Sequence, residues 1–256
     1  MKVLVTRPAA QAAEWVARLH ERGVTALALP LLDILPAPDA AAVVAAWSHL
    51  DAHSLLVFVS PNAAEQFFAL RPAQAAWPQS TRAASTGPGT SQALLRLGVP
   101  RAQLVGPADD AAQFDSEALW AQLANDDWHD RRVLIVRGDG GRDWLAETLR
   151  AHGARVAHLA AYRRGPPRWH DAEHAVLAAA LAAPADHLWL FSSSEAIDQL
   201  VATAGEAGWR AARAIATHPR IAARARQAGF GSVTLSRPEL DAVVACIQSA
   251  PPIELA

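Results

Sequence analysis

The chain has very little cysteine, tyrosine or methionine, with one residue of each among 256. A lone cysteine, Cys246, cannot form an internal disulfide and leaves too few thiolates for a zinc site. Positive charge is not in excess either, and the formal net charge of −2 argues against a nucleic-acid-binding protein. Long apolar runs are also missing, because the alanine-rich run 175–183 is too short to span a bilayer. The composition therefore excludes a disulfide-stapled or membrane-spanning protein.

The amino terminus gives no targeting signal. It reads MKVLVTRPAA, where only three apolar residues follow one another, so we predict a first strand and no signal peptide. Apolar residues make up 52% of the chain and charged residues 19%, which provides a core and gives no sign of disorder. We therefore expect a soluble cytoplasmic protein.

The stretch 133–164 is the most informative part of the chain. Residues 133–136 form an apolar, β-branched run typical of a buried parallel strand. The glycine-rich segment 137–141 favours a turn that faces an anion, not a continued strand. A helical pattern then ends at Gly153, and a second strand is predicted over 154–161. Together these segments predict a βαβ unit, whose turn is a common ligand site.

Strand and helix patterns alternate along the rest of the chain, which predicts an α/β fold with parallel sheets. A proline-containing hinge is expected at 35–38. Further strands are predicted at 3–5, 25–32, 55–59, 82–85, 103–105, 187–191, 214–216 and 233–235.

The chain also contains an internal repeat. Three blocks of residues recur in the same order at nearly the same offset, which predicts two similar halves divided near residue 130. Loops after corresponding strands are then expected to face each other across a cleft. Matching pairs include Arg7 with Arg137, Ser60 with Ser192 and Pro88 with Pro219.

Six predicted loops follow apolar strands and precede helices. They are rich in hydroxyls, glycine and arginine, which suits carboxylates or phosphates held by helix N-termini and guanidiniums. Taken one at a time, their Ser, Thr, Asn and Asp side chains are more typical of ordinary helix N-caps, whereas the six loops together favour binding. The loops are 6–8, 60–62, 86–90, 137–141, 192–194 and 217–220.

Other motifs support other chemistries poorly. Segment 137–141 lacks the lysine of a P-loop and the spacing of a dinucleotide fingerprint. His170 and His174 have no third metal ligand nearby, so we interpret them as part of a solvated helix start. Ser192–Ser194 have no assignable base, which leaves a hydrolase triad without support. Tyr162, the only tyrosine, fits either a half-buried packing residue or a phenol that donates a proton within the cleft.

Several short motifs also occur in a characteristic order. They are LVTRP at 4–8, FVSPNAA at 58–64, GPGT at 87–90, LIVRGDGGR at 134–142, AYRR at 161–164, HPRIA at 218–222 and DAV at 241–243. In this order they resemble the bacterial branch of the uroporphyrinogen-III synthase family over nearly the whole chain.

The resemblance implies an α/β protein with two doubly wound parallel-sheet domains joined by a two-stranded linker, the first domain being discontinuous. The implied boundaries are 1–35 with 167–256 for domain one, 38–163 for domain two, and linkers near 33–38 and 162–168. In this arrangement each sequence repeat does not form one domain, so a division of the chain near residue 130 is wrong.

The implied activity is cyclisation of hydroxymethylbilane to uroporphyrinogen III, with inversion of the last pyrrole ring, loss of water, and no cofactor or metal. Catalysis would be mainly positioning, helped by a weak acid, and Tyr162 matches the family's tyrosine for that role. Expected partners are the substrate and, transiently, the preceding deaminase, with no nucleic acid or membrane, and we expect a monomer. The implied substrate-binding residues are Arg7, Ser60, Asn62, Thr90, Arg137, Gly138, Asp139, Gly140, Gly141, Ser192, Ser193, Ser194 and Arg220.

One loop departs from the family pattern. Many relatives have two threonines after the proline of the last repeat, whereas this chain has Arg220 and Ile221. We therefore rank this loop below the others.

Two other functions stay open from the residues. One is a non-catalytic two-domain binder of small polyanions, similar in outline to periplasmic binding proteins, which the missing signal peptide disfavours. The other is a sugar-nucleotide transferase, which the lack of an acidic metal motif and of a nucleotide loop disfavours.

Overall fold

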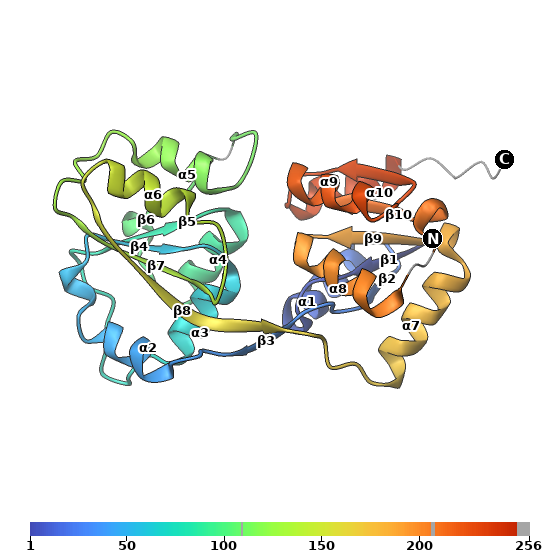
Figure 1. Cartoon of the computed structure of the whole chain (residues 1–256), viewed down its shortest axis with the longest axis horizontal. Helices are drawn as coiled ribbons and strands as arrows, with labels where there is room; N and C mark the ends of the chain where they lie inside the picture. Colours follow the sequence, from blue (N-terminus) through green and yellow to red (C-terminus); the bar gives the residue numbers. More distant parts are fainter. Residues whose placement is uncertain (109, 206–207, 250–256) are drawn as a thin grey trace. The chain divides into compact units, whose positions relative to one another are not determined.

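The structure, a computed structural model, describes residues 1–108, 110–205 and 208–249 (Figure 1). The chain divides into two compact units. Domain 1 comprises Met1–Asp33 and the described residues from Gly165 onward, and domain 2 comprises Ile34–Arg164. The predicted fold class is confirmed, because each domain contains a largely parallel sheet and the first is built from both ends of the chain.

Domain 1 contains a five-stranded parallel sheet with the order β11-β10-β9-β1-β2. Its strands are β1 (Lys2–Val5), β2 (Ala26–Ala28), β9 (His187–Phe191), β10 (Arg213–Ala216) and β11 (Ser232–Leu235). Its helices are α1 (Ala9–Glu21), α7 (Asp171–Ala182), α8 (Ser194–Ala204), α9 (Pro219–Gln227) and α10 (Leu240–Ser249).

Both faces of this sheet are covered, as a doubly wound fold requires. Successive side chains of a strand point to opposite faces. Val3 and Val5 therefore join a core cluster with α1 and α10, whereas Leu4 joins a separate cluster with α7, α8 and α9.

Domain 2 contains a six-stranded sheet with the order β3-β8-β7-β4-β5-β6, in which the pairs from β8 to β6 are parallel. Its strands are β3 (Asp33–Pro36), β4 (Leu55–Phe58), β5 (Arg82–Ser85), β6 (Leu104–Val105), β7 (Arg132–Gly138) and β8 (Arg155–Gly165). Its helices are α2 (Ala40–Trp47), α3 (Pro61–Ala69), α4 (Pro88–Arg96), α5 (Ser116–Leu123) and α6 (Trp144–Ala151).

Helices also cover both faces of the second sheet. Leu56 and Phe58 pack with α2, α3 and α4, and Leu55 and Val57 pack with α5 and α6. Short 3₁₀ helices precede β4, β6, β9 and β10, at Leu50–Ala52, Arg101–Gln103, Pro184–Asp186 and Trp209–Ala211. None of the described helices is long and apolar enough to cross a membrane.

The strand orders explain the internal repeat. Domain 1 reads β11-β10-β9-β1-β2 and domain 2 reads β6-β5-β4-β7-β8-β3, so every strand except β3 has a counterpart in the other half of the chain. Each domain nevertheless takes strands from both repeats, because β7 pairs with β4, as in Val57 opposite Ile135, and β1 pairs with β9. A division near residue 130 would break these hydrogen bonds and is wrong.

Four predicted boundaries need correction. The strand expected at 154–161 is β8, which runs over Arg155–Gly165 and so contains Tyr162. The strand expected at 25–32 is only Ala26–Ala28, and the hinge expected at 35–38 begins inside β3. Strand β7 continues two residues beyond the predicted end, because Arg137 pairs with Ala160 and Gly138, after a register shift, pairs with Tyr162. Strands β3 and β8 are neighbours and carry the chain between the domains, which gives the two-stranded linker.

Candidate active site

The predicted loops gather at one edge of each sheet. Within a parallel sheet the carboxyl ends of the strands lie along the same edge. In domain 2 the loops after β7, β4 and β5 follow three adjacent strands, and in domain 1 the loops after β10, β9 and β1 do the same. The sequence therefore places three candidate loops together in each domain.

The phenol of Tyr162 lies inside domain 2 beside the loop after β4. Only 1% of its surface is exposed, and its ring belongs to the core cluster of Phe58 and Val136. The phenol oxygen lies 3.2 Å from Ser60 Oγ and accepts a hydrogen bond of 3.0 Å from Arg164 Nη2. Tyr162 is thus more deeply buried than the half-buried packing residue that the sequence suggested, and its one polar atom is hydrogen-bonded.

Ser60 has two roles in this arrangement. It is the N-cap of α3, where its Oγ accepts a hydrogen bond of 3.1 Å from the backbone amide of Ala63. The same oxygen contacts the phenol of Tyr162. The N-cap interpretation is therefore correct for Ser60, and it does not exclude a role in the site.

Gly138 packs directly against the phenol. The register shift between β7 and β8 pairs Gly138 with Tyr162. A Cβ atom added at Gly138 would lie 3.0 Å from Tyr162 Cζ and 3.3 Å from its oxygen. A side chain at this position would push the phenol away from its partners.

We predict that Gly138→Ala lowers kcat about tenfold, because a misplacement of about 1 Å near reacting groups typically costs on the order of a hundredfold. The variant should stay folded, since the phenol needs to move by only a few tenths of an ångström. Steady-state kinetics would measure the effect, with Gly208→Ala as control because a methyl there meets no atom of the described residues within 4 Å. Unchanged kcat in Gly138→Ala would show that the position of the phenol does not matter.

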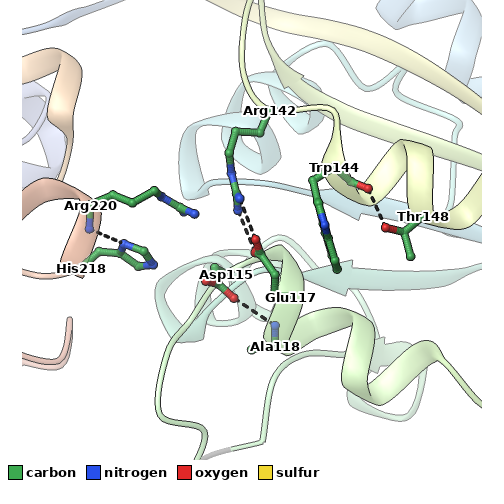
Figure 2. A network of polar contacts seen from close by, with 8 residues as sticks. All are labelled: Asp115, Glu117, Ala118, Arg142, Trp144, Thr148, His218 and Arg220. Carbon is green, nitrogen blue, oxygen red and sulfur yellow. Dashed lines mark hydrogen bonds and ion pairs between the residues drawn. The ribbon is translucent and has the colours of Figure 1, made fainter.

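The glycine turn that follows β7 is held by an ion pair at each end. Arg137 Nη1 donates to Asp143 Oδ1 at 2.6 Å. Arg142 makes a bidentate pair with Glu117 at 2.6 and 2.8 Å (Figure 2). The Arg137 guanidinium lowers the pKa of Asp143, and the hydrogen bond to Glu117 raises the pKa of Arg142. The two pairs fix the two ends of the turn.

The partner of Arg142 is itself fixed by the start of α5. Asp115 caps this helix by accepting a hydrogen bond of 3.0 Å from the amide of Ala118, and Glu117 follows in the first turn (Figure 2). A carboxylate in the first turn is also favoured by the helix dipole. The ion pair between Arg142 and Glu117 therefore attaches the glycine turn to a well-capped helix.

Arg7 occupies the corresponding position after β1 in domain 1. Its guanidinium lies over the Trp15 ring, 4.4 Å from the centroid, and its Nε is buried without a hydrogen-bond partner among the described residues. Burial lowers the pKa of Arg7 to about 10, although Glu14 acts in the opposite direction. A cation held in this way is suited to an anionic ligand, which would satisfy its buried nitrogen.

Comparison with known proteins identifies the family. The family model described as Uroporphyrinogen-III synthase HemD matches residues 13–245. The chain belongs to the uroporphyrinogen-III synthase family. The prediction from the sequence motifs is thereby confirmed, including the assignment to a hydro-lyase of tetrapyrrole biosynthesis.

Individual relatives agree with this assignment. The uroporphyrinogen-III synthase of Escherichia coli is 30% identical over 179 residues, which is 69% of this chain and 70% of that protein. The synthase of Salmonella typhimurium is 29% identical over 180 residues, with coverage of 69% and 70%.

Solved structures of synthases support the fold. That of Helicobacter pylori has a TM-score of 0.60 at 14% identity and covers 97% of this chain and 98% of its own. A mutant synthase of Thermus thermophilus has a TM-score of 0.59 at 16% identity, with 97% coverage of both chains.

The remaining residues implied by the family resemblance lie on several elements of the two domains. In domain 2, Asn62 lies in the first turn of α3, Thr90 is buried within α4 and Asp139 is exposed in the glycine turn. In domain 1, Ser193 precedes α8 without making a side-chain cap hydrogen bond, and the amide of Arg220 donates to His218 Nδ1.

The pair His170 and His174 fits its interpretation as a helix start. The backbone amide of His170 donates to the carboxylate of Glu173, which lowers the pKa of that carboxylate. Over the described ranges, no cluster of three His, Cys, Asp or Glu side chains could hold a metal ion.

Sequence reasoning missed Arg164 as a partner of the phenol. Residues two apart on a strand point to the same face, so Tyr162 and Arg164 on β8 are neighbours by the simplest strand rule. That signal was present in the sequence. The contact of Tyr162 with Ser60, 102 residues away, left no local signal.

Proposed function

We propose that this protein cyclises hydroxymethylbilane to uroporphyrinogen III, inverting the last pyrrole ring and releasing water. The observation that carries the proposal is the phenol of Tyr162, held by Ser60 and Arg164 at the loop edge of domain 2. A phenol in such a setting is a suitable weak acid for a leaving hydroxyl. Membership of the family supports the choice of substrate.

The substrate is a flexible polycarboxylate, and we propose that loops of both domains bind its carboxylates. Arg137, which Asp143 already fixes, and the amides of the glycine turn suit this role in domain 2. Arg7, with its unpartnered Nε, suits it in domain 1. The full proposed binding set is Arg7, Ser60, Asn62, Thr90, Arg137, Gly138, Asp139, Gly140, Gly141, Ser192, Ser193, Ser194 and, with a lower rank, Arg220.

The proposed chemistry needs one proton at the start and returns it at the end. Protonation of the terminal hydroxyl breaks its C–O bond and releases water, and the electron-rich pyrrole stabilises the resulting cation. The substituted carbon of the last ring then attacks, and a spiro-pyrrolenine intermediate rearranges to the inverted ring. Loss of a ring proton restores the aromatic pyrrole and gives back the proton that was spent. The protein acts mainly by folding the chain and selecting the attacking carbon.

We further propose that the domains move about their linkers during this reaction. The proposed boundaries are those implied by the family, with linkers near 33–38 and 162–168. We also propose that the protein acts in the cytoplasm as a monomer and receives its substrate from the preceding deaminase.

The test is the isomer composition of the product. Porphobilinogen and a deaminase generate hydroxymethylbilane, which closes without a synthase to isomer I. Adding this protein should shift the oxidised product, separated by chromatography, from isomer I to isomer III. If only isomer I forms with folded protein, the enzymatic proposal fails and a polyanion binder becomes the better account.

A further inference from the structure

We propose that Ser60 Oγ, rather than the phenol of Tyr162, touches the leaving hydroxyl, and that Tyr162 supplies its proton through Ser60. This inference rests on the proposed function and assigns the contact with the substrate to a different residue. Arg164 completes the arrangement as a positioning residue for the phenol.

The burial of Tyr162 is the first argument. Only 1% of the residue is exposed and its ring is part of the hydrophobic core, so the phenol presents almost no surface to a ligand. Ser60 is less buried and lies at the carboxyl end of β4, where the loop meets α3. A ligand over this edge of the sheet reaches Ser60 first.

The direction of the hydrogen bonds is the second argument. A guanidinium has donors only, so Arg164 Nη2 donates to the phenol oxygen at 3.0 Å. In the contact between Tyr162 and Ser60, 3.2 Å long, either oxygen can donate, and we assign the donated hydrogen to the phenol.

Ser60 continues the chain of donors. Its oxygen already accepts from the amide of Ala63 at 3.1 Å, and with the phenol as second donor both of its acceptor positions are filled. The one hydrogen of the Ser60 hydroxyl is therefore directed to a third group. Arg164, Tyr162 and Ser60 thus form a proton relay. Its last member, the Ser60 hydroxyl, has a hydrogen that it can donate to a substrate.

The relay transfers one proton in two linked steps. The leaving hydroxyl takes the hydrogen of Ser60 Oγ, its C–O bond breaks, and water departs. Ser60 Oγ takes the hydrogen of the Tyr162 phenol, which leaves a phenolate beside the Arg164 guanidinium. The opposite charge stabilises this anion. The proton lost when the last ring regains aromaticity returns along the same path, so no outside acid or base is consumed.

Double-mutant kinetics test the relay. Ser60→Ala should lower kcat about as much as Tyr162→Phe, on the order of a hundredfold, with KM changed less than about threefold. The double variant should be no slower than either single variant, because both changes interrupt one path. Ser60→Thr keeps the hydroxyl and the cap and should restore kcat to within about threefold of the original protein.

Two controls distinguish a loss of proton transfer from a change in the structure of the protein. Asp39→Ala removes the cap of α2, as Ser60→Ala removes that of α3, and it should leave kcat unchanged. Tyr162 is the only tyrosine, so ¹³Cζ-tyrosine labelling gives one NMR signal. This signal should shift in Arg164→Gln, which should also lower kcat about tenfold with little change in KM.

The outcomes distinguish this inference from the proposed function. If the original protein forms isomer III and Ser60→Ala keeps full kcat, the relay is wrong and the function stands. If the two losses of kcat multiply in the double variant, to on the order of ten thousandfold, Ser60 and Tyr162 act independently. That result would also overturn the relay. If the original protein forms no isomer III, both proposals fall.

Discussion

Tyr162→Phe should lower kcat for isomer III about a hundredfold and leave KM within about threefold. General acid catalysis typically contributes about 10²–10⁴-fold, and the lower end applies because positioning of the substrate persists in the variant. Phenylalanine keeps the buried ring and removes only the oxygen that contacts Ser60 and Arg164. The change therefore affects the proposed proton donor and little of the packing.

The coupled assay at saturating substrate measures this effect. Arg163→Gln is the matched control, because Arg163 is the next residue of β8 and its side chain is exposed. It should retain full kcat. Full activity in Tyr162→Phe would remove Tyr162 from the mechanism, whatever the isomer formed by the original protein.

Gly231→Ala should destabilise domain 1 by about 3 kcal/mol or more, at the upper end of the cost of overpacking. A Cβ atom added at Gly231 would clash with the backbone oxygen of Arg210. The backbone has little room to move away, because the amide of Gly231 donates to Trp209 O at 3.1 Å and to Ala212 O at 3.2 Å. Relief of the clash would break the start of the β10–β11 pairing.

Urea unfolding followed by tryptophan fluorescence measures this loss, since Trp189 and Trp209 are buried in domain 1. Gly208→Ala is the control, because Gly208 lies in the connection that contains Arg210, has a φ of −71°, and has no atom of the described residues within 4 Å of an added methyl. It should change the stability by less than about 1 kcal/mol. Equal stability of the two variants would contradict the close approach of Gly231 to Arg210.

Local sequence patterns predicted most of the secondary structure and the fold class. Apolar runs such as 55–59 and 187–191 became buried strands, because burial on both faces of a parallel sheet demands continuous apolar residues. The pairing of β4 with β7 was different, since it joins Val57 to Ile135 across two repeats. Periodicity describes a strand's faces and not its neighbours, so the repeat alone suggested the wrong division, and the order of family motifs corrected it.

The candidate site was predictable only in part. Tyr162, Ser60 and Gly138 were all candidates from the sequence, and the structure brings these three together. The depth of the phenol was not predictable, because it depends on how β8 shifts register beside Gly138. The pairing of Arg142 with Glu117 was also missed, because a loop and a distant helix start carry no shared pattern.

The most direct test of the account is turnover at low protein concentration. One molecule of protein per thousand of hydroxymethylbilane should convert most of the substrate to isomer III before spontaneous closure to isomer I competes. The Tyr162→Phe variant should give the same isomer ratio when its concentration is a hundred times higher. A protein that changes the ratio only at equal concentration with the substrate would be a binder, and that result would contradict the catalytic account.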